Sequence, residues 1–159
     1  MQIRKVTCLV AALASLCLAA SALAASAGRA TAALSSSKAG AKHVTMTVSL
    51  TTELQCGRLM GSRTLVVTLP AKARIAKTVP ATAVLVSGKA VSEVAVAGRV
   101  LTLSLAPPSG MMCDSITTGI AKVVVGTTAG LRNPAAPGGY TVRVVHGGES
   151  FAAPFKIHS

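Results

Sequence analysis

The sequence predicts an all-β protein that folds as an antiparallel β-sandwich of about seven to eight short strands. Three observations lead to this fold class. Apolar and polar residues alternate with a period of two in several short segments, which is the pattern of half-buried strands. Glycine and proline turn signals recur about every 8 to 12 residues. No segment after the N-terminal leader has the apolar period of an amphipathic helix, and a closed barrel is the alternative architecture.

Residues 1–24 have the three regions of a cleavable secretory signal peptide. Arg4 and Lys5 supply positive charge, and an uncharged apolar run follows them directly. Ala22 and Ala24 fit the small-x-small rule for signal peptidase. The apolar run is shorter than the roughly 20 residues that a membrane-spanning helix needs. We therefore expect a secreted or extracytoplasmic protein associated with the cell envelope, with an uncleaved N-terminal anchor as the alternative.

Residues 25–42 are predicted to form a flexible linker between the signal peptide and the folded domain. They are rich in Ala, Ser, Gly and Lys, and they have no repeating apolar face. Their alanine content also permits a short helix. The folded domain is then expected to span residues 43–159.

The expected strands, in chain order, are residues 43–54, 64–69, 82–86, 90–96, 99–105, 120–125, 140–145 and 151–157. In the first of them every second residue from Val44 to Leu50 is apolar, which predicts one buried face. Pro70 ends the second strand. The basic segment 71–80 that follows has room for one helical turn or an extended connection.

Glycine turns join the third, fourth and fifth expected strands. Gly88 and Gly98 lie at their centres, so residues 84–105 are predicted to form a three-stranded meander. The sixth strand is nearly continuous in apolar character, which predicts a central and buried position. Pro154 lies inside the eighth strand. Because proline cannot donate a ladder hydrogen bond, it predicts an edge position or a bulge there.

Two cysteines remain after the signal peptide is removed. Cys8 and Cys17 leave with it, while Cys56 and Cys113 enter an oxidising compartment, where a disulfide is the default expectation. This bridge would close a loop of about 57 residues and stabilise the fold by on the order of 4 kcal/mol. The alternative is a pair of reactive or metal-binding thiols, against which the absence of a C-x-x-C spacing counts.

The chain is strongly basic, with a formal net charge of +12. Loss of Arg4 and Lys5 leaves 14 basic and 4 acidic residues, a net charge of +10. One modest cluster, at Lys72, Arg74 and Lys77, is a possible basic binding patch. We expect an anionic cell-wall polymer or a membrane surface as its partner and no nucleic acid, because export and a scarcity of aromatic residues disfavour nucleic-acid binding. The alternative is that the charge only keeps the protein soluble.

No catalytic residue is expected, and the chain is interpreted as a non-enzyme. The sequence contains no G-x-S-x-G elbow, P-loop or dinucleotide-binding fingerprint. Its few acidic residues are not paired at a short spacing that would suit acid–base catalysis. These residues are Glu53, Glu93, Asp114 and Glu149.

Three methionines near the two cysteines define an alternative hypothesis, a copper site. Met60 follows Cys56, and Met111 and Met112 directly precede Cys113. Thioether and imidazole groups suit copper, especially Cu(I). The competing interpretation is that these methionines fill space around the disulfide, in which case the protein carries no cofactor.

The segment 130–144, GLRNPAAPGGYTVRV, resembles a recurring pattern of bacterial cell-surface proteins, written loosely as G-I-x-N-P-x-x-P-G-x-Y-T. Leu69-Pro70, Pro80 and the VLVSG segment at 84–88 resemble the upstream part of the same immunoglobulin-like module. Ser87 stands where that pattern often has Asn, and the cysteines do not belong to it. The resemblance covers residues 43–157 and implies an immunoglobulin-like sandwich in a surface or secreted setting, with no activity.

The sequence as a whole therefore predicts a secreted, non-enzymatic immunoglobulin-like module. The expected role is that of a structural or interaction protein of the cell envelope. The alternative is an extracytoplasmic copper-binding protein that uses Met and His ligands.

Overall fold

The computed structural model describes residues 28–54, 64–105 and 117–159. Two short 3-10 helices, η1 (Ala81–Ala83) and η2 (Thr127–Ala129), are the only helices in these ranges. The remaining elements are strands. They are β1 (Gly28–Leu34), β2 (Met46–Leu54), β3 (Thr64–Thr68), β4 (Val84–Val86), β5 (Lys89–Ala90), β6 (Glu93–Ala97), β7 (Val100–Ser104), β8 (Thr117–Val125), β9 (Gly138–His146) and β10 (Glu149–Ile157).

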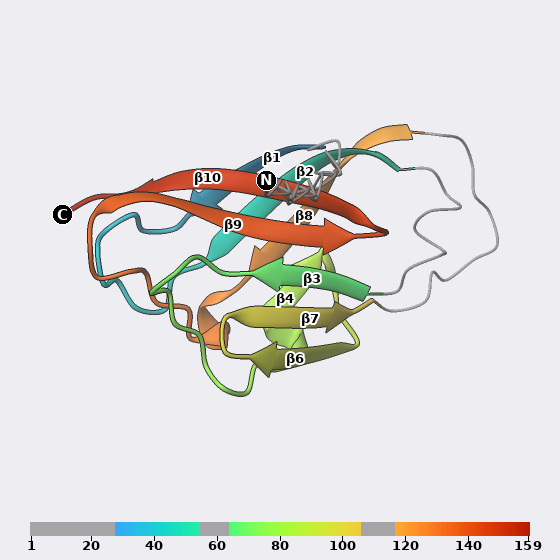
Figure 1. The fold of residues 1–159 in the computed structure, drawn as a ribbon. Coiled ribbons are helices and arrows are strands. Elements are labelled where there is room, and N and C mark those ends of the chain that lie inside the picture. Colours follow the sequence, from blue (N-terminus) through green and yellow to red (C-terminus); the bar gives the residue numbers. More distant parts are fainter. Residues whose placement is uncertain (1–27, 55–63, 106–116) are drawn as a thin grey trace, which may run out of the picture.

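The strands form two five-stranded antiparallel layers. One layer has the order β5-β4-β8-β2-β1, and the other has the order β10-β9-β3-β7-β6. Figure 1 shows β9, β3, β7 and β6 as one layer, with β2, β8 and β4 crossing behind it. The layers meet at a short parallel contact, where Gly28 of β1 pairs with Phe151 of β10 and Arg29 pairs with Ala152. The prediction of an all-β antiparallel sandwich is confirmed.

A barrel does not form from the described strands, because β5 and β6 each have a neighbour on one side only. The two layers are nevertheless continuous through β1 and β10. This parallel contact acts as a seam along one side of the sandwich, while the opposite side ends in the β5 and β6 edges.

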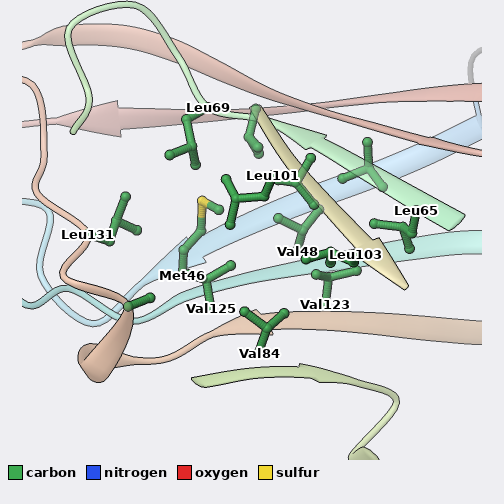
Figure 2. Packing of buried hydrophobic residues seen from close by; sticks show 14 of the residues in the cluster. Met46, Val48, Leu65, Leu69, Val84, Leu101, Leu103, Val123, Val125 and Leu131 are labelled. Atoms are coloured by element: carbon green, nitrogen blue, oxygen red, sulfur yellow. The ribbon is translucent and has the colours of Figure 1, made fainter. Parts of the chain in front are cut away.

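The core lies between the two layers and is filled mainly by valine and leucine. The period-two pattern of β2 turns Met46, Val48 and Leu50 inward, each at most 2 % exposed. Figure 2 shows the layer that contains β2 facing the other layer across the core. The labelled side chains come from both layers and are Met46, Val48, Leu65, Leu69, Val84, Leu101, Leu103, Val123, Val125 and Leu131.

The expected central position of residues 120–125 is confirmed, and the expected burial holds for one face of the strand. They form the second half of β8, which lies between β2 and β4 and buries Val123 and Val125 completely. The strand still has a polar outer side, where Lys122 is exposed. A central position in the sheet therefore does not require both faces of this strand to be covered.

The prediction of a flexible linker at 25–42 is wrong for residues 28–34, which form β1. This strand pairs with β2 along its whole length, from Arg29 opposite Thr51 to Leu34 opposite Met46. Ala30 and Ala32 are half-buried, whereas Thr31 and Ala33 between them are exposed. Alanine occurs on both faces of β1, so the buried and exposed residues of this strand alternate but differ little in hydrophobicity.

The predicted three-stranded meander over 84–105 is also wrong. Strand β4 pairs with β5 and β8 in one layer, whereas β6 pairs with β7 in the other. The chain crosses between the layers at Val91, which is 4 % exposed and anchors the crossing in the core. Both predicted glycine turns are present, with Gly88 at φ +82° and Gly98 at φ +61°. The turns and the pairing of β6 with β7 are as predicted, but residues 84–105 do not form one meander, because β5 and β6 belong to different layers.

Pro154 has the edge character that the sequence predicts, although β10 is not an edge strand. Strand β10 pairs with β9 at every position from Glu149 to Ile157. The register with β1 includes only Phe151 and Ala152. Pro154 therefore lies where β10 has no ladder partner on its β1 side, and the missing N–H group leaves no carbonyl of β1 unpaired.

We expect replacement of Leu101 by Ala to lower the free energy of unfolding by about 2–5 kcal/mol, because it removes a fully buried side chain and leaves a cavity. Urea unfolding followed by circular dichroism measures this change. Val145→Ala is the control, since Val145 is 39 % exposed and its loss should cost less than about 1 kcal/mol. Equal effects of the two changes would contradict this account of the core.

The cysteines Cys56 and Cys113 lie outside the described residues, so their bridge stays a prediction. The strands that flank them are paired, with Leu54 of β2 opposite Thr117 of β8. The segment with Cys56 follows β2, and the segment with Cys113 precedes β8, at the same end of this strand pair. This connectivity is compatible with a bridge between the two cysteines.

We expect the mass of the purified protein before reduction to be lower, by the mass of two hydrogen atoms, than its mass after reduction. Reduction should lower the free energy of unfolding by on the order of 4 kcal/mol. Mass spectrometry and urea unfolding with and without reductant measure the two effects. In the control, a Cys56→Ser/Cys113→Ser variant, reductant should change neither quantity. Two free thiols in the oxidised wild-type protein would rule out the bridge.

Candidate basic binding surface

Four connections lie at the end of the sandwich where the chain finishes, on the left in Figure 1. They join β1 to β2, β3 to η1, β6 to β7 and β8 to β9. The register places them together, because Leu34 pairs with Met46, and Met46 with Val125, at this end of one layer. We call this region the basic end. Its seven basic residues are Lys38, Lys42, Lys72, Arg74, Lys77, Arg99 and Arg132.

None of these four connections contains an acidic residue. The acids that fall in described strands are at the opposite end of the molecule. Glu53 lies next to the C-terminal residue of β2, Glu93 begins β6 and Glu149 begins β10. The fold thus places these three acids away from the seven basic residues of the basic end, while other basic residues, such as Arg29 of β1, lie outside it.

Asn133 joins two of the connections and is a buried polar residue, 4 % exposed. Its side-chain Nδ2 donates to the carbonyl oxygens of Ser36 (2.8 Å) and Lys38 (2.9 Å). Its backbone N–H donates to the carbonyl oxygen of Ala41 at 2.9 Å. These three bonds fix the β1–β2 connection, with Lys38 and Lys42, against the β8–β9 connection.

The β3–η1 connection is held against the same β8–β9 connection. Arg74 and Arg132 form an isolated antiparallel bridge, in which the Arg74 N–H donates to Arg132 (3.1 Å) and the Arg132 N–H donates to Arg74 (2.8 Å). A further backbone bond runs from the N–H of Ala76 to the carbonyl of Ala129 at 3.2 Å. Gly130 lies beside Ala76, where a Cβ atom would be 3.3 Å from the Ala76 Cβ. This close approach leaves little space for a larger residue.

Lys72 occupies an unusual backbone conformation at the tip of its turn. The N–H of Ala73 donates to the carbonyl of Pro70 at 3.2 Å, and Lys72 between them has φ +67°. A turn of this kind favours Gly or Asn at that position, and another residue there costs on the order of 1 kcal/mol. The chain keeps an exposed lysine at a position where glycine would be less strained.

The β6–β7 turn is fixed to the end of β3 by a reciprocal pair of bonds. The N–H of Leu69 donates to the carbonyl of Arg99 at 2.9 Å, and Nη1 of Arg99 donates to the carbonyl of Leu69 at 3.0 Å. Arg99 therefore has a structural role in addition to its charge. All four connections of the basic end are thus joined to one another or to a strand end.

Tyr140 closes the turn-rich loop that precedes β9. Its hydroxyl donates to the carbonyl of Ala136 at 2.8 Å, and its ring stacks with Phe155 at a centroid distance of 6.1 Å. Together with the buried Asn133, these contacts account for the N-P-x-x-P-G-x-Y segment as a structural element. It supports the basic end and does not itself supply charge.

The three basic residues that the sequence singled out, Lys72, Arg74 and Lys77, are all exposed on one connection. Sequence reasoning missed the other four, because they are isolated along the chain. A signal was present only for Arg132, which lies between two expected strands, 120–125 and 140–145, and so in a connection at an end of the sandwich. Lys38 and Lys42 fall in the segment expected to be a linker, and Arg99 falls at the start of an expected strand.

The residues of the copper hypothesis, Met60, Met111 and Met112, lie outside the described residues together with Cys56 and Cys113. Across 28–54, 64–105 and 117–159, no group of three or more His, Cys, Asp or Glu residues is placed to hold a metal ion. Copper binding by the methionines stays a prediction.

The fold and this surface define a class: a two-layer β-sandwich with one strongly basic end. No protein-family model matches the chain, and no curated protein matches it. Among solved structures it is similar to BslA, a bacterial hydrophobin, with a TM-score of 0.52 and 17 % sequence identity. The similarity covers 83 % of this chain and 98 % of that one. It concerns the fold. None of the helices in the described ranges is long and apolar enough to span a membrane.

We expect Asn133→Ala to lower the free energy of unfolding by about 2 kcal/mol, because the carbonyls of Ser36 and Lys38 lose their donor. Asn133→Asp is the matched variant, since it keeps the shape but replaces the donor with acceptors. It should destabilise at least as much. Urea unfolding measures both, and a wild-type stability of the Asp variant would show that Nδ2 does not hold the connection.

Proposed function

We propose that the protein is a secreted, non-enzymatic immunoglobulin-like module of the cell envelope whose basic end binds an anionic cell-wall polymer. The observation that carries the proposal is the separation of charge. Seven basic residues gather on four connections that contain no acid, while Glu53, Glu93 and Glu149 lie at the other end. A surface of one sign attracts polyanions over several ångströms and orients them on approach.

The surface is suited to a partner that is large and flexible. It spans four connections that backbone hydrogen bonds fix to one another, so the backbone positions from which the charged side chains extend are set without a partner. A polymer with many negative charges can contact several of them at once, and each contact adds to the affinity. The proposal includes no catalytic step, because cationic side chains without a carboxylate provide binding but no acid–base pair.

A polymer is favoured over a membrane surface by what surrounds the charges. Stable association with lipid usually combines charge with apolar side chains that enter the bilayer. The exposed large apolar residue among the described ones is Val145, which lies near the C-terminal end of β9, away from the basic end. The resemblance of segment 130–144 to surface proteins and the fold similarity to a bacterial hydrophobin support an extracellular setting.

Co-sedimentation with purified cell walls tests the proposal. We expect the wild-type protein to bind at about 50 mM NaCl and to be released as the salt rises toward about 500 mM, because screening weakens interactions between exposed charges. A Lys72→Gln/Arg74→Gln/Lys77→Gln variant should bind about tenfold more weakly or worse.

The matched control is Lys89→Gln/Lys122→Gln/Arg143→Gln, which removes the same net charge from exposed residues outside the basic end. It should retain most of the wall binding. Equal losses in the two triple variants would show that only net charge matters, and binding that ignores salt would contradict the proposal. Anionic vesicles form a separate arm, and a preference for them over cell walls would assign the surface to membranes instead.

A further inference from the structure

Arg74 and Arg132 occupy directly opposite positions in the antiparallel bridge at the centre of the basic end. They exchange both backbone hydrogen bonds, at 3.1 and 2.8 Å, and so form a hydrogen-bonded pair. In such a pair the two side chains leave the backbone on the same side, with their Cβ atoms roughly 4.5–5.5 Å apart. The fold therefore places two guanidinium-bearing residues next to each other, although they are 58 positions apart in the chain.

Two like charges at directly opposite positions repel each other and destabilise the pairing. Neither connection contains an acidic residue that could offset this repulsion. An anion bound between the two guanidinium groups would convert the repulsion into two attractive contacts. The arrangement is thus unfavourable in the free protein and becomes favourable when a negatively charged group is present.

The Arg132 side chain is already held in position. Its Nε donates to the carbonyl of Gly40 at 3.2 Å, and the residue is half-buried. Its Nη2 lies 3.8 Å from the point where a Cβ atom on Gly40 would stand. Gly40 has φ +69°, a conformation that favours glycine, and it holds the carbonyl that accepts this bond beside the guanidinium group. A side chain fixed in advance loses less conformational entropy when it binds.

Lysines surround this pair on both sides. Lys38 and Lys42 belong to the connection that Arg132 contacts through Gly40, and Lys72 and Lys77 belong to the same connection as Arg74. All four are exposed. They extend the positive surface away from the two arginines, so that one anionic group on the pair would have further anionic groups of the same chain near the lysines.

Resting on the proposed function, the geometry points to a specific ligand chemistry: the Arg74–Arg132 pair binds one phosphate group of a phosphate-bearing chain polymer, and the lysines bind its neighbours. A guanidinium group donates two parallel hydrogen bonds to a pair of oxygens. A carboxylate accepts hydrogen bonds mainly in its own plane. The non-bridging oxygens of a phosphate group are not confined to one acceptor plane, so two guanidinium groups on one protein face can share them more readily.

Competition between two polyanions tests this inference. The probes are inorganic polyphosphate and poly-L-glutamate of matched charge number, with dissociation constants measured by fluorescence anisotropy at constant salt. We expect the wild-type protein to prefer polyphosphate by about tenfold, because the acceptor geometry of phosphate suits both arginines better than that of a carboxylate. An Arg74→Lys/Arg132→Lys variant keeps the charge but loses the paired fork geometry, and its preference should disappear.

Arg143→Lys is the matched control, since Arg143 is exposed on β9 outside the basic end, and it should leave the preference unchanged. Arg74→Lys alone provides a second variant that spares the Arg132–Gly40 hydrogen bond. It should reduce the preference by at least half, and it tests the inference even if the double variant does not fold. Equal affinity of the wild-type protein for both polymers, or full retention of the preference in Arg74→Lys, would overturn the inference.

The outcomes separate this inference from the proposed function. Salt-sensitive wall binding with no preference for phosphate would leave the envelope module standing and overturn the arginine pair as a phosphate site. Failure to bind cell walls, together with a clear preference for polyphosphate, would overturn the proposed partner while supporting the phosphate site.

Discussion

Contact between the inward faces of the two five-stranded layers holds the other features of this molecule in place. The side chains that make this contact are almost all aliphatic, and several of them, such as Val48, Val123 and Leu101, are fully buried. Burial of apolar surface is the main favourable term in folding, and it acts here with few aromatic residues, of which Phe151 is buried in the core. Because the core fixes where each strand ends, it also fixes where each connection begins.

The basic end depends on that core indirectly, because the core fixes where its four connections begin. Connections that carry many like charges repel one another and tend to separate. Here Asn133 and the Arg74–Arg132 bridge supply backbone-directed hydrogen bonds that keep them together. The repulsion between like charges and the hydrogen bonds that oppose it therefore act within a few residues of each other. A surface assembled in this way is stiff enough to present its charges at set distances, and it retains the electrostatic potential that attracts a polyanion.

Sequence patterns predicted this fold where the contrast between residues was strong. Alternating valine, methionine and leucine residues predicted β2, and a nearly continuous apolar run predicted β8. Strand β1 was missed because alanine, threonine and glycine give little contrast between its two faces. The meander was wrong because periodicity identifies strands but not the layer that each one joins: β4 pairs with β5 and β8, whereas β6 and β7 pair in the other layer. The same limit applied to the basic end: Lys72, Arg74 and Lys77 were close in sequence, whereas Arg132 joins them only through the fold.

The parallel contact between β1 and β10 has a consequence for biogenesis. It joins the first described strand of the chain to the last, and these are far apart in sequence, so the contact pays a large loop-closure cost before it forms. Because a chain is synthesised from its N-terminus, β1 is made long before β10. The side of the sandwich that β1 and β10 share therefore stays open until β10 has been made, and until then β2 is the strand with which β1 can pair.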